Sequence, residues 1–94
     1  MSLKSANAFL DHVAEVLDER QEMYGDALPL FEQVATRWSL VLGVEVTAPQ
    51  VALCMMDFKM ARLTVDPKHL DSNVDVVGFA ALLAKIQAAD DGEV

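Results

Sequence analysis

The chain has 94 residues, the length of one domain, and carries a formal charge of -8 at pH 7. This charge argues against non-specific binding to nucleic acid, because an acidic chain and the phosphates repel each other. Hydrophobic residues make up 53% of the chain, which is more than one small core can bury. We therefore expect a homo-oligomer, either a dimer or a tetramer, in which a second copy covers part of them.

The ends of the chain and its longest apolar run bear on where the protein works. No basic region followed by a long apolar segment opens the sequence, and the run 76–84 is too short to cross a bilayer. We expect a cytoplasmic protein with no membrane partner, folded as a single helical domain over 1–94. The ends, 1–4 and 90–94, are expected to be flexible. The single cysteine, Cys54, lies among apolar residues and is expected to be buried.

The first half of the chain predicts two helices. Apolar residues recur at three- and four-residue steps over 5–22, and Gly25 is expected to end this helix because glycine tolerates a left-handed conformation. The second helix is expected to begin at Asp26, a good N-terminal cap, and to end at Gly43. The segment 43–47 is expected to be a connection, since one short strand would have no partner.

The third predicted helix opens at Thr47, and Gln50 three positions later completes a capping-box pattern. The run 51–56 has no polar break, so this half of the helix is expected to be buried on most sides. Lys59 and Arg62 then bring polarity back before the helix ends.

The fourth helix is expected to begin at Asp71 or Ser72 and to run to about Ala88. Ser72 and Asp75 resemble a second capping pair. Gly78 costs this helix about 1 kcal/mol relative to alanine. Its presence therefore predicts that another helix crosses closely at that position.

Four helices joined by short connections predict an all-α fold, a four-helix antiparallel bundle. The last helix is expected to lie at its centre, because it is apolar on every face from residue 76 onwards. In an up-down-up-down bundle the first and third turns lie at the same end. The polar residues expected at that end are Arg20, Tyr24, Asp26, Lys59, Arg62, His69, Asp71 and Asp75.

One interpretation of this polar end is a network of ion pairs between two helices. Lys59 and Arg62 are three positions apart, so they share one helix face. Asp71 and Asp75 are four positions apart and share another face. The helix dipoles favour cations at the end of one helix and carboxylates at the start of the next. Such a network needs no ligand.

The other interpretation is a nucleotide or phosphate site. Two carboxylates on one helix face are suited to a hard cation such as Mg²⁺, with phosphate oxygens completing its shell. Nearby cations would neutralise the phosphates, and an aromatic ring would stack on a base. No catalytic residue is identified. The candidate ligand-binding residues are Tyr24, Lys59, Arg62 and His69, and the candidate metal ligands are Asp71 and Asp75.

Many of these residues belong to a wider pattern that covers most of the chain, from about residue 20 to residue 83. The pattern resembles a family of short phage and prophage proteins to which no activity is attached. The resemblance implies a phage-type accessory protein that works in the cytoplasm of the host cell. The motifs include Tyr24-Gly25-Asp26, Leu42-Gly43-Val44, Lys59-Met60-Ala61-Arg62, Pro67-Lys68-His69 and Asp75-Val76-Val77-Gly78-Phe79-Ala80.

A more distant similarity is to the all-α NTP pyrophosphatases, the MazG and dimeric dUTPase group. Those enzymes carry a Glu-x-x-Asp motif at the start of an apolar helix, and here Ser72 stands at the Glu position with Asp75 at the Asp position. Lys59 and Arg62 lie where a cluster of carboxylates is expected. The resemblance implies a helical oligomer with a nucleotide link, an incomplete metal site and weak or absent pyrophosphate hydrolysis.

Two functions therefore remain open. The chain is either a nucleotide-binding accessory protein or a helical oligomeric interaction module without a small-molecule site. The surroundings of Asp75 distinguish them. Ion pairs to Lys59 or Arg62 favour the module, whereas a carboxylate that faces open space favours the ligand site.

Overall fold

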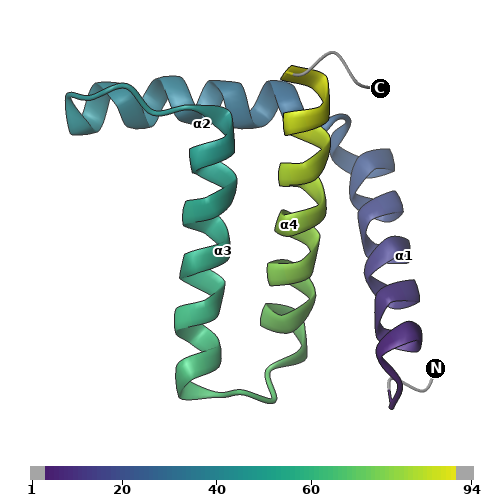
Figure 1. The fold of residues 1–94 in the computed structure, drawn as a ribbon. Helices are drawn as coiled ribbons and strands as arrows, with labels where there is room; N and C mark the ends of the chain where they lie inside the picture. Colours follow the sequence, from purple (N-terminus) through teal and green to yellow (C-terminus); the bar gives the residue numbers. More distant parts are fainter. Residues whose placement is uncertain (1–3, 91–94) are drawn as a thin grey trace.

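The computed structural model describes residues 4–90 and contains four helices and no strand in that part of the chain. The predicted all-α fold is therefore confirmed. The helices are α1 (Ala6–Tyr24), α2 (Ala27–Leu42), α3 (Ala48–Val65) and α4 (Leu70–Asp90), shown in Figure 1. The predicted flexible ends lie outside the described residues, apart from Lys4 and Asp90. Within residues 4–90, no helix combines the length and the apolar character needed to cross a membrane.

The helix termini follow the capping residues of the sequence. The side chains of Ser5, Asp26 and Thr47 each accept a backbone N–H in the first turn of the helix that follows. Gln50 closes the predicted capping box by accepting the backbone N–H of Thr47 at 2.9 Å. Gly43 ends α2 with a φ of 72°, a left-handed conformation that suits glycine.

The start of α4 differs from the prediction by one residue. The helix begins at Leu70, so Ser72 lies inside its first turn and does not cap it. The ring of His69 takes that role, because its Nδ1 accepts the backbone N–H of Ser72 at 3.2 Å. The predicted capping pair of Ser72 and Asp75 was therefore wrong, and both side chains are buried.

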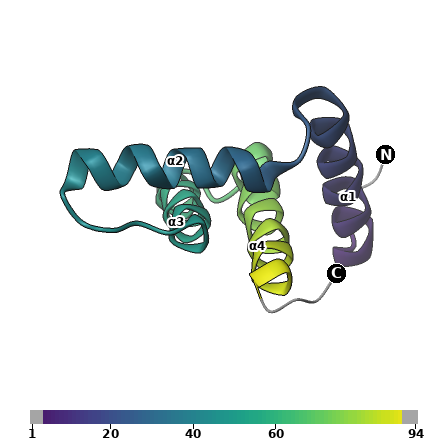
Figure 2. The same cartoon turned by 90° about the horizontal axis from the view of Figure 1, so that it is seen from above.

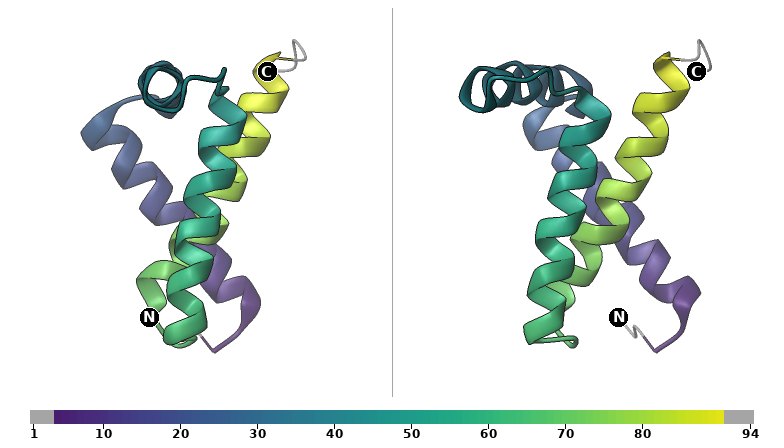
Figure 3. Two further views of the ribbon diagram at one scale, coloured as in Figure 1. Left: turned by 90° about the vertical axis from the view of Figure 1, so that its left-hand side faces the viewer. Right: turned by 60° about the vertical axis from the view of Figure 1, so that its left-hand side comes forward.

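The helices are arranged around an antiparallel hairpin. α3 and α4 run side by side in opposite directions, and α2 lies across the end of this hairpin where α3 begins (Figures 1 and 2). α1 packs beside α4 on the side away from α3, and it crosses α4 at a tilt (Figure 3). α4 thus lies between α3 and α1, the central position predicted for it. The radius of gyration is 14.4 Å, larger than the roughly 12 Å of a compact domain of this length.

The crosswise path of α2 changes which turns share an end. The first turn lies where α4 finishes, because Asp26 Oδ1 is 3.3 Å from Lys85 Nζ. The third turn lies at the opposite end of the hairpin (Figure 1). The expectation that both turns gather at one polar end was therefore wrong.

The main core lies where α2 crosses the hairpin. It combines side chains from three helices, and Phe31 on α2 packs against Phe79 on α4 with ring centroids 6.1 Å apart. α1 contributes separately to the protein interior, where Val13 and Val74 on α4 are both buried. The buried members of the main core are Phe31, Ala35, Ala48, Val51, Ala52 and Ile86.

Two further expectations about packing were wrong. Cys54 is exposed, because the run 51–56 winds around α3, so that only Val51 and Ala52 are buried and Met55 is partly buried against the core. Gly78 is not crossed closely by another helix. A methyl group at Gly78 would meet only Leu17 Cδ2, at an ordinary contact distance of 3.8 Å.

The hydroxyl of Ser39 on α2 hydrogen-bonds to the connection between α2 and α3. Ser39 Oγ accepts the backbone N–H of Val46 at 2.8 Å and donates to the carbonyl of Ala35 at 2.7 Å. These bonds fix the point at which the chain turns from α2 into α3, and hence the angle between the two helices.

Candidate functional site

Asp75 on α4 is the buried charged residue in the described part of the chain. Its side chain is 6% exposed. Oδ1 lies 3.0 Å from Nη2 of Arg20 on α1, and Oδ2 lies 3.0 Å from Nζ of Lys59 on α3. One carboxylate therefore joins three helices. Burial of a charge is costly unless it is paired, and here both oxygens have a cationic partner.

Half of this arrangement could be read from the sequence. The pairing of Lys59 with Asp75 is the one expected from an ion-pair network across the α3–α4 hairpin. Arg62 does not take part, because its side chain is exposed and forms no ion pair with the described residues. Arg20 takes its place. The signal that points to it is that Arg20 is the only lysine or arginine in the acidic α1.

His69 serves the helix start rather than a ligand in this structure. Its Nδ1 lies 2.7 Å from Ser72 Oγ and accepts the backbone N–H of the same residue. The same ring nitrogen thus forms hydrogen bonds with both the backbone N–H and the hydroxyl of Ser72. Ser72 is completely buried, so His69 satisfies a hydroxyl that water does not reach.

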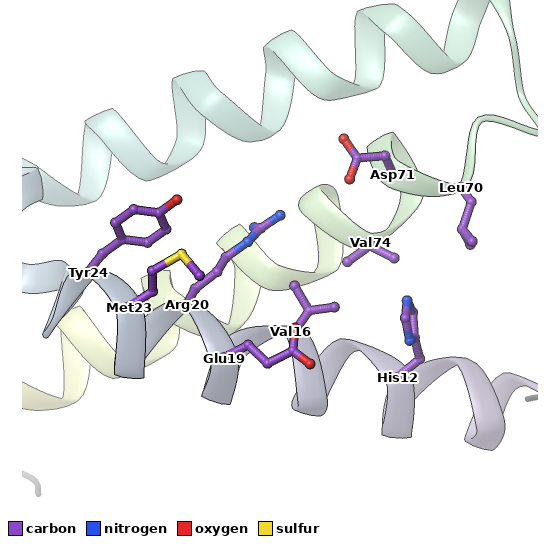
Figure 4. Close-up of a pocket in the computed structure, with 9 residues that line it drawn as sticks. All are labelled: His12, Val16, Glu19, Arg20, Met23, Tyr24, Leu70, Asp71 and Val74. Carbon is purple, nitrogen blue, oxygen red and sulfur yellow. The ribbon is translucent and has the colours of Figure 1, made fainter.

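A cavity of about 520 Å³ lies between α1 and the start of α4 (Figure 4). Its lining includes Tyr24, a predicted ligand-binding residue, and Asp71, a predicted metal ligand, which lie near its opposite ends in Figure 4. Arg20 projects into the same space from α1. Lys59, Arg62 and His69 are not part of its lining, which consists of His12, Val16, Glu19, Arg20, Met23, Tyr24, Leu70, Asp71 and Val74.

The carboxylates do not converge as a metal site in this structure. Among residues 4–90 there is no group of three or more His, Cys, Asp or Glu side chains placed to hold a metal ion. Asp75 uses both oxygens for Arg20 and Lys59, while Asp71 is exposed at the cavity wall. The Mg²⁺ site of Asp71 and Asp75 stays a prediction.

A second groove, of about 390 Å³, lies between α1, α2 and α4. Its apolar wall includes Leu17, Phe31 and Phe79. At its rim, Asp26 accepts the backbone N–H of Leu28 and pairs with Lys85. These two contacts, the N–H first and the lysine second, lower the pKa of Asp26 below its usual value.

Comparisons with known proteins match the chain to a family and to a phage protein. The family described as a domain of unknown function, DUF6378, matches residues 8–87. The "Gene 55 protein" of Mycobacterium phage L5 is 39% identical over 74 residues, which cover 78% of this chain and 47% of that protein. The chain therefore spans about half the length of this curated relative. No solved structure matches the present chain.

Proposed function

The chain belongs to the DUF6378 family, and we propose that it acts as a helical oligomeric interaction module, a phage-type accessory protein that self-associates through apolar helix faces. The similarity to a phage protein supports the accessory role. The large apolar side chains exposed on the four helices support the self-association.

The observation that carries the proposal is the number of large apolar side chains that the fold leaves exposed. Among the described residues, thirteen such side chains are exposed, whereas only five residues larger than alanine are buried in the apolar core. A single soluble domain rarely exposes large contiguous apolar surface, which usually marks an interface. The open arrangement of the helices leads to the same conclusion, because one chain cannot close around its own apolar residues.

The exposed apolar side chains are concentrated in two places. One is the end of α2 and the turn that follows it, where Leu40, Val41, Leu42 and Val44 are each more than 60% exposed. The other is α3, which exposes Phe58 and Val65 on one face and Leu53 and Met60 on another.

The surroundings of Asp75 also favour the module. Its two ion pairs leave the carboxylate no free oxygen to offer a ligand, and they hold three helices in place. Buried ion pairs of this kind occur as structural elements without any ligand.

Sedimentation velocity over a dilution series of the full chain tests self-association. The expected result is a species of at least twice the 10.3 kDa chain mass that dissociates on dilution. A matched pair of variants localises the effect. Phe58→Gln, on the apolar surface, should shift the chain towards monomer, and Thr36→Gln, on the exposed face of α2, should not. A chain that stays monomeric at every concentration would overturn the proposal.

A second candidate is nucleotide or phosphate binding at the cavity between α1 and α4. One observation favours it, namely that Tyr24, Arg20 and Asp71 line the same space. The tyrosine ring would stack on a base, and the guanidinium would contact a phosphate. Any hydrolysis would be of the NTP pyrophosphatase type, with Mg²⁺ as the expected metal.

Thermal shifts with a panel of nucleotides, with and without Mg²⁺, test this second function. Stabilisation that is lost in Tyr24→Ala and Asp71→Ala but kept in Arg62→Ala would support it, since Arg62 lies outside the cavity lining. Pyrophosphate release would then be measured with the nucleotide that binds. Absence of any nucleotide-dependent shift would count against the site.

A further inference from the structure

The outer surface of α3 carries an apolar seam with the spacing of a coiled coil. Cys54, Phe58, Ala61 and Val65 follow one another at steps of four, three and four residues. This is the repeat that places residues at positions d, a, d and a of a heptad. All four side chains are exposed, Phe58 at 58% and Val65 at 88%. The subunit itself thus leaves the whole seam uncovered.

A second apolar stripe on α3 is already partly used inside the subunit. It consists of Leu53, Met56, Met60 and Leu63, which have the same type of spacing. Met56 and Leu63 are half-buried by the neighbouring helices, whereas no member of the first seam is. Leu53 and Met60 are themselves 51% exposed, but the second stripe has two half-buried members and the seam has none. The seam of Cys54, Phe58, Ala61 and Val65 is therefore the stripe that its own subunit covers least.

Two opposite charges flank this seam. Asp57 lies at a g position on one side, and Arg62 lies at an e position on the other. Both are exposed, and neither forms an ion pair with the described residues. In a parallel pair of helices, a g residue faces the e residue five positions later on the other helix. Asp57 and Arg62 have that separation.

We propose that two copies of the chain pair in parallel along α3, with Asp57 of each copy bonded to Arg62 of the second copy. This inference rests on the proposed self-association and names its surface. The Phe58 side chains would meet in one layer, next to a layer of small Ala61 side chains, so that large and small residues alternate. Charged e and g residues determine the orientation of such pairs.

The antiparallel arrangement does not satisfy these charges. In an antiparallel pair, g residues face g residues and e residues face e residues. Asp57 would then have no cation opposite it, and Arg62 would approach Arg62 of the second copy. Like charges at these positions disfavour a pairing.

The fold leaves room for a parallel pair. The seam begins at Cys54, after Val51 and Ala52, which are buried in the core, and it runs to the end of α3. α1 lies on the far side of α4 from α3 (Figure 1).

Cys54 provides a direct test, because it is the only cysteine in the chain and lies on the seam. In a parallel pair the two Cys54 thiols face each other, so a short bis-maleimide should link the full chain into a covalent dimer. In an antiparallel pair Cys54 faces residue 65, so linkage would require Val65→Cys in the same chain as Cys54. Cys54→Ser is the control for reaction elsewhere.

Charge reversal tests the flanking pairs. Asp57→Arg alone and Arg62→Asp alone should each raise the dissociation constant of the dimer by about tenfold. The double variant, which restores opposite charges, should return it close to that of the original chain. Asp66→Arg, an exposed acidic residue beyond the end of α3, is the matched control and should have little effect.

The outcomes separate this inference from the proposed function. Linkage through Cys54 together with rescue in the double variant supports the parallel pair. A chain that self-associates without Cys54 linkage and without response to charge reversal rejects the seam but leaves the interaction module standing. Linkage only in the Val65→Cys variant rejects the parallel orientation. A monomeric chain rejects both proposals.

Discussion

Arg20 on α1 and Asp75 on α4 are 55 positions apart in the sequence, and their side chains meet at 3.0 Å between Nη2 and Oδ1. Lys59 on α3 holds the other oxygen of the same carboxylate. The two cations differ in their exposure, since the Arg20 side chain is 45% exposed and that of Lys59 is 20% exposed. The three residues therefore do not contribute equally to stability.

Loss of Asp75 should be the most damaging single change to this cluster. Asp75→Ala leaves the largely buried ammonium of Lys59 without a partner and should lower the free energy of unfolding by about 3 kcal/mol. Urea unfolding followed by circular dichroism measures the change. Asp71→Ala, which removes an exposed carboxylate one turn earlier on the same helix, is the matched control and should change stability by less than about 0.5 kcal/mol.

Arg20→Ala should cost less than Asp75→Ala. Asp75 keeps its bond to Lys59 in this variant, and the arginine that is lost is nearly half exposed, so we expect about 1 kcal/mol. The same urea titration gives the value. An effect as large as that of Asp75→Ala would show that the link to α1, and not the link to α3, stabilises the carboxylate.

His69→Ala should destabilise the start of α4. The change removes the acceptor of the Ser72 backbone N–H and leaves a fully buried hydroxyl without its partner, at a cost of about 2 kcal/mol. His69→Asn should recover part of the loss, because asparagine also caps helices. Thermal unfolding of the three proteins compares them. Equal stability of the original chain and His69→Ala would contradict the capping role.

Gly78→Ala should stabilise the chain by up to about 1 kcal/mol. The added methyl group has room, because only Leu17 Cδ2 lies within 4 Å of it, and alanine favours the helix more than glycine does. Thermal unfolding at fixed protein concentration measures the gain. A loss of stability instead would mean that a second copy or a ligand approaches α4 at this point.

The stability of the chain should depend on the protonation of Asp26 at acidic pH. Its pKa is lowered by the backbone N–H of Leu28 and then by Lys85, so the folded state binds a proton less readily than the unfolded chain. The stabilisation is therefore complete above the pKa of the unfolded chain, about 4, and is lost as the pH falls through the lower folded value. Unfolding by urea at a series of pH values compares the original chain with Asp26→Asn. The difference between them should shrink below pH about 4, and a constant difference would rule out this linkage.

The sequence predicts the helices better than their arrangement. Capping residues such as Thr47 and the glycines at 25 and 43 act within a few positions, so the termini of α1 to α3 could be located from local patterns. The direction of α2 depends on a connection held by Ser39, whose bonds to the turn leave no periodic signal. For this reason the crosswise path of α2 was missed.

In the candidate site, too, the contact between neighbouring helices could be predicted and the long-range contact could not. Lys59 and Asp75 lie on helices joined by a four-residue turn, and such a hairpin brings them together whatever the other helices do. Arg20 reaches the same carboxylate because α1 packs beside α4 and crosses it at a tilt (Figure 3), and the angle of that crossing leaves no pattern in the sequence. The exposure of Cys54 could not be predicted for a different reason. An unbroken apolar run does not reveal which side of a helix is covered by the rest of its own subunit.

The long separation between Arg20 and Asp75 has a consequence for the order in which the molecule folds. The α3–α4 hairpin and the turn that hydrogen-bonds to Ser39 each form between residues that are close in the sequence. The docking of α1 onto α4 closes a loop of 55 positions, and a longer loop has a higher entropic cost of closure. α1 should therefore join a preformed hairpin late and be the first helix to leave it. In hydrogen exchange, its amides should lose their protection before those of α3 and α4.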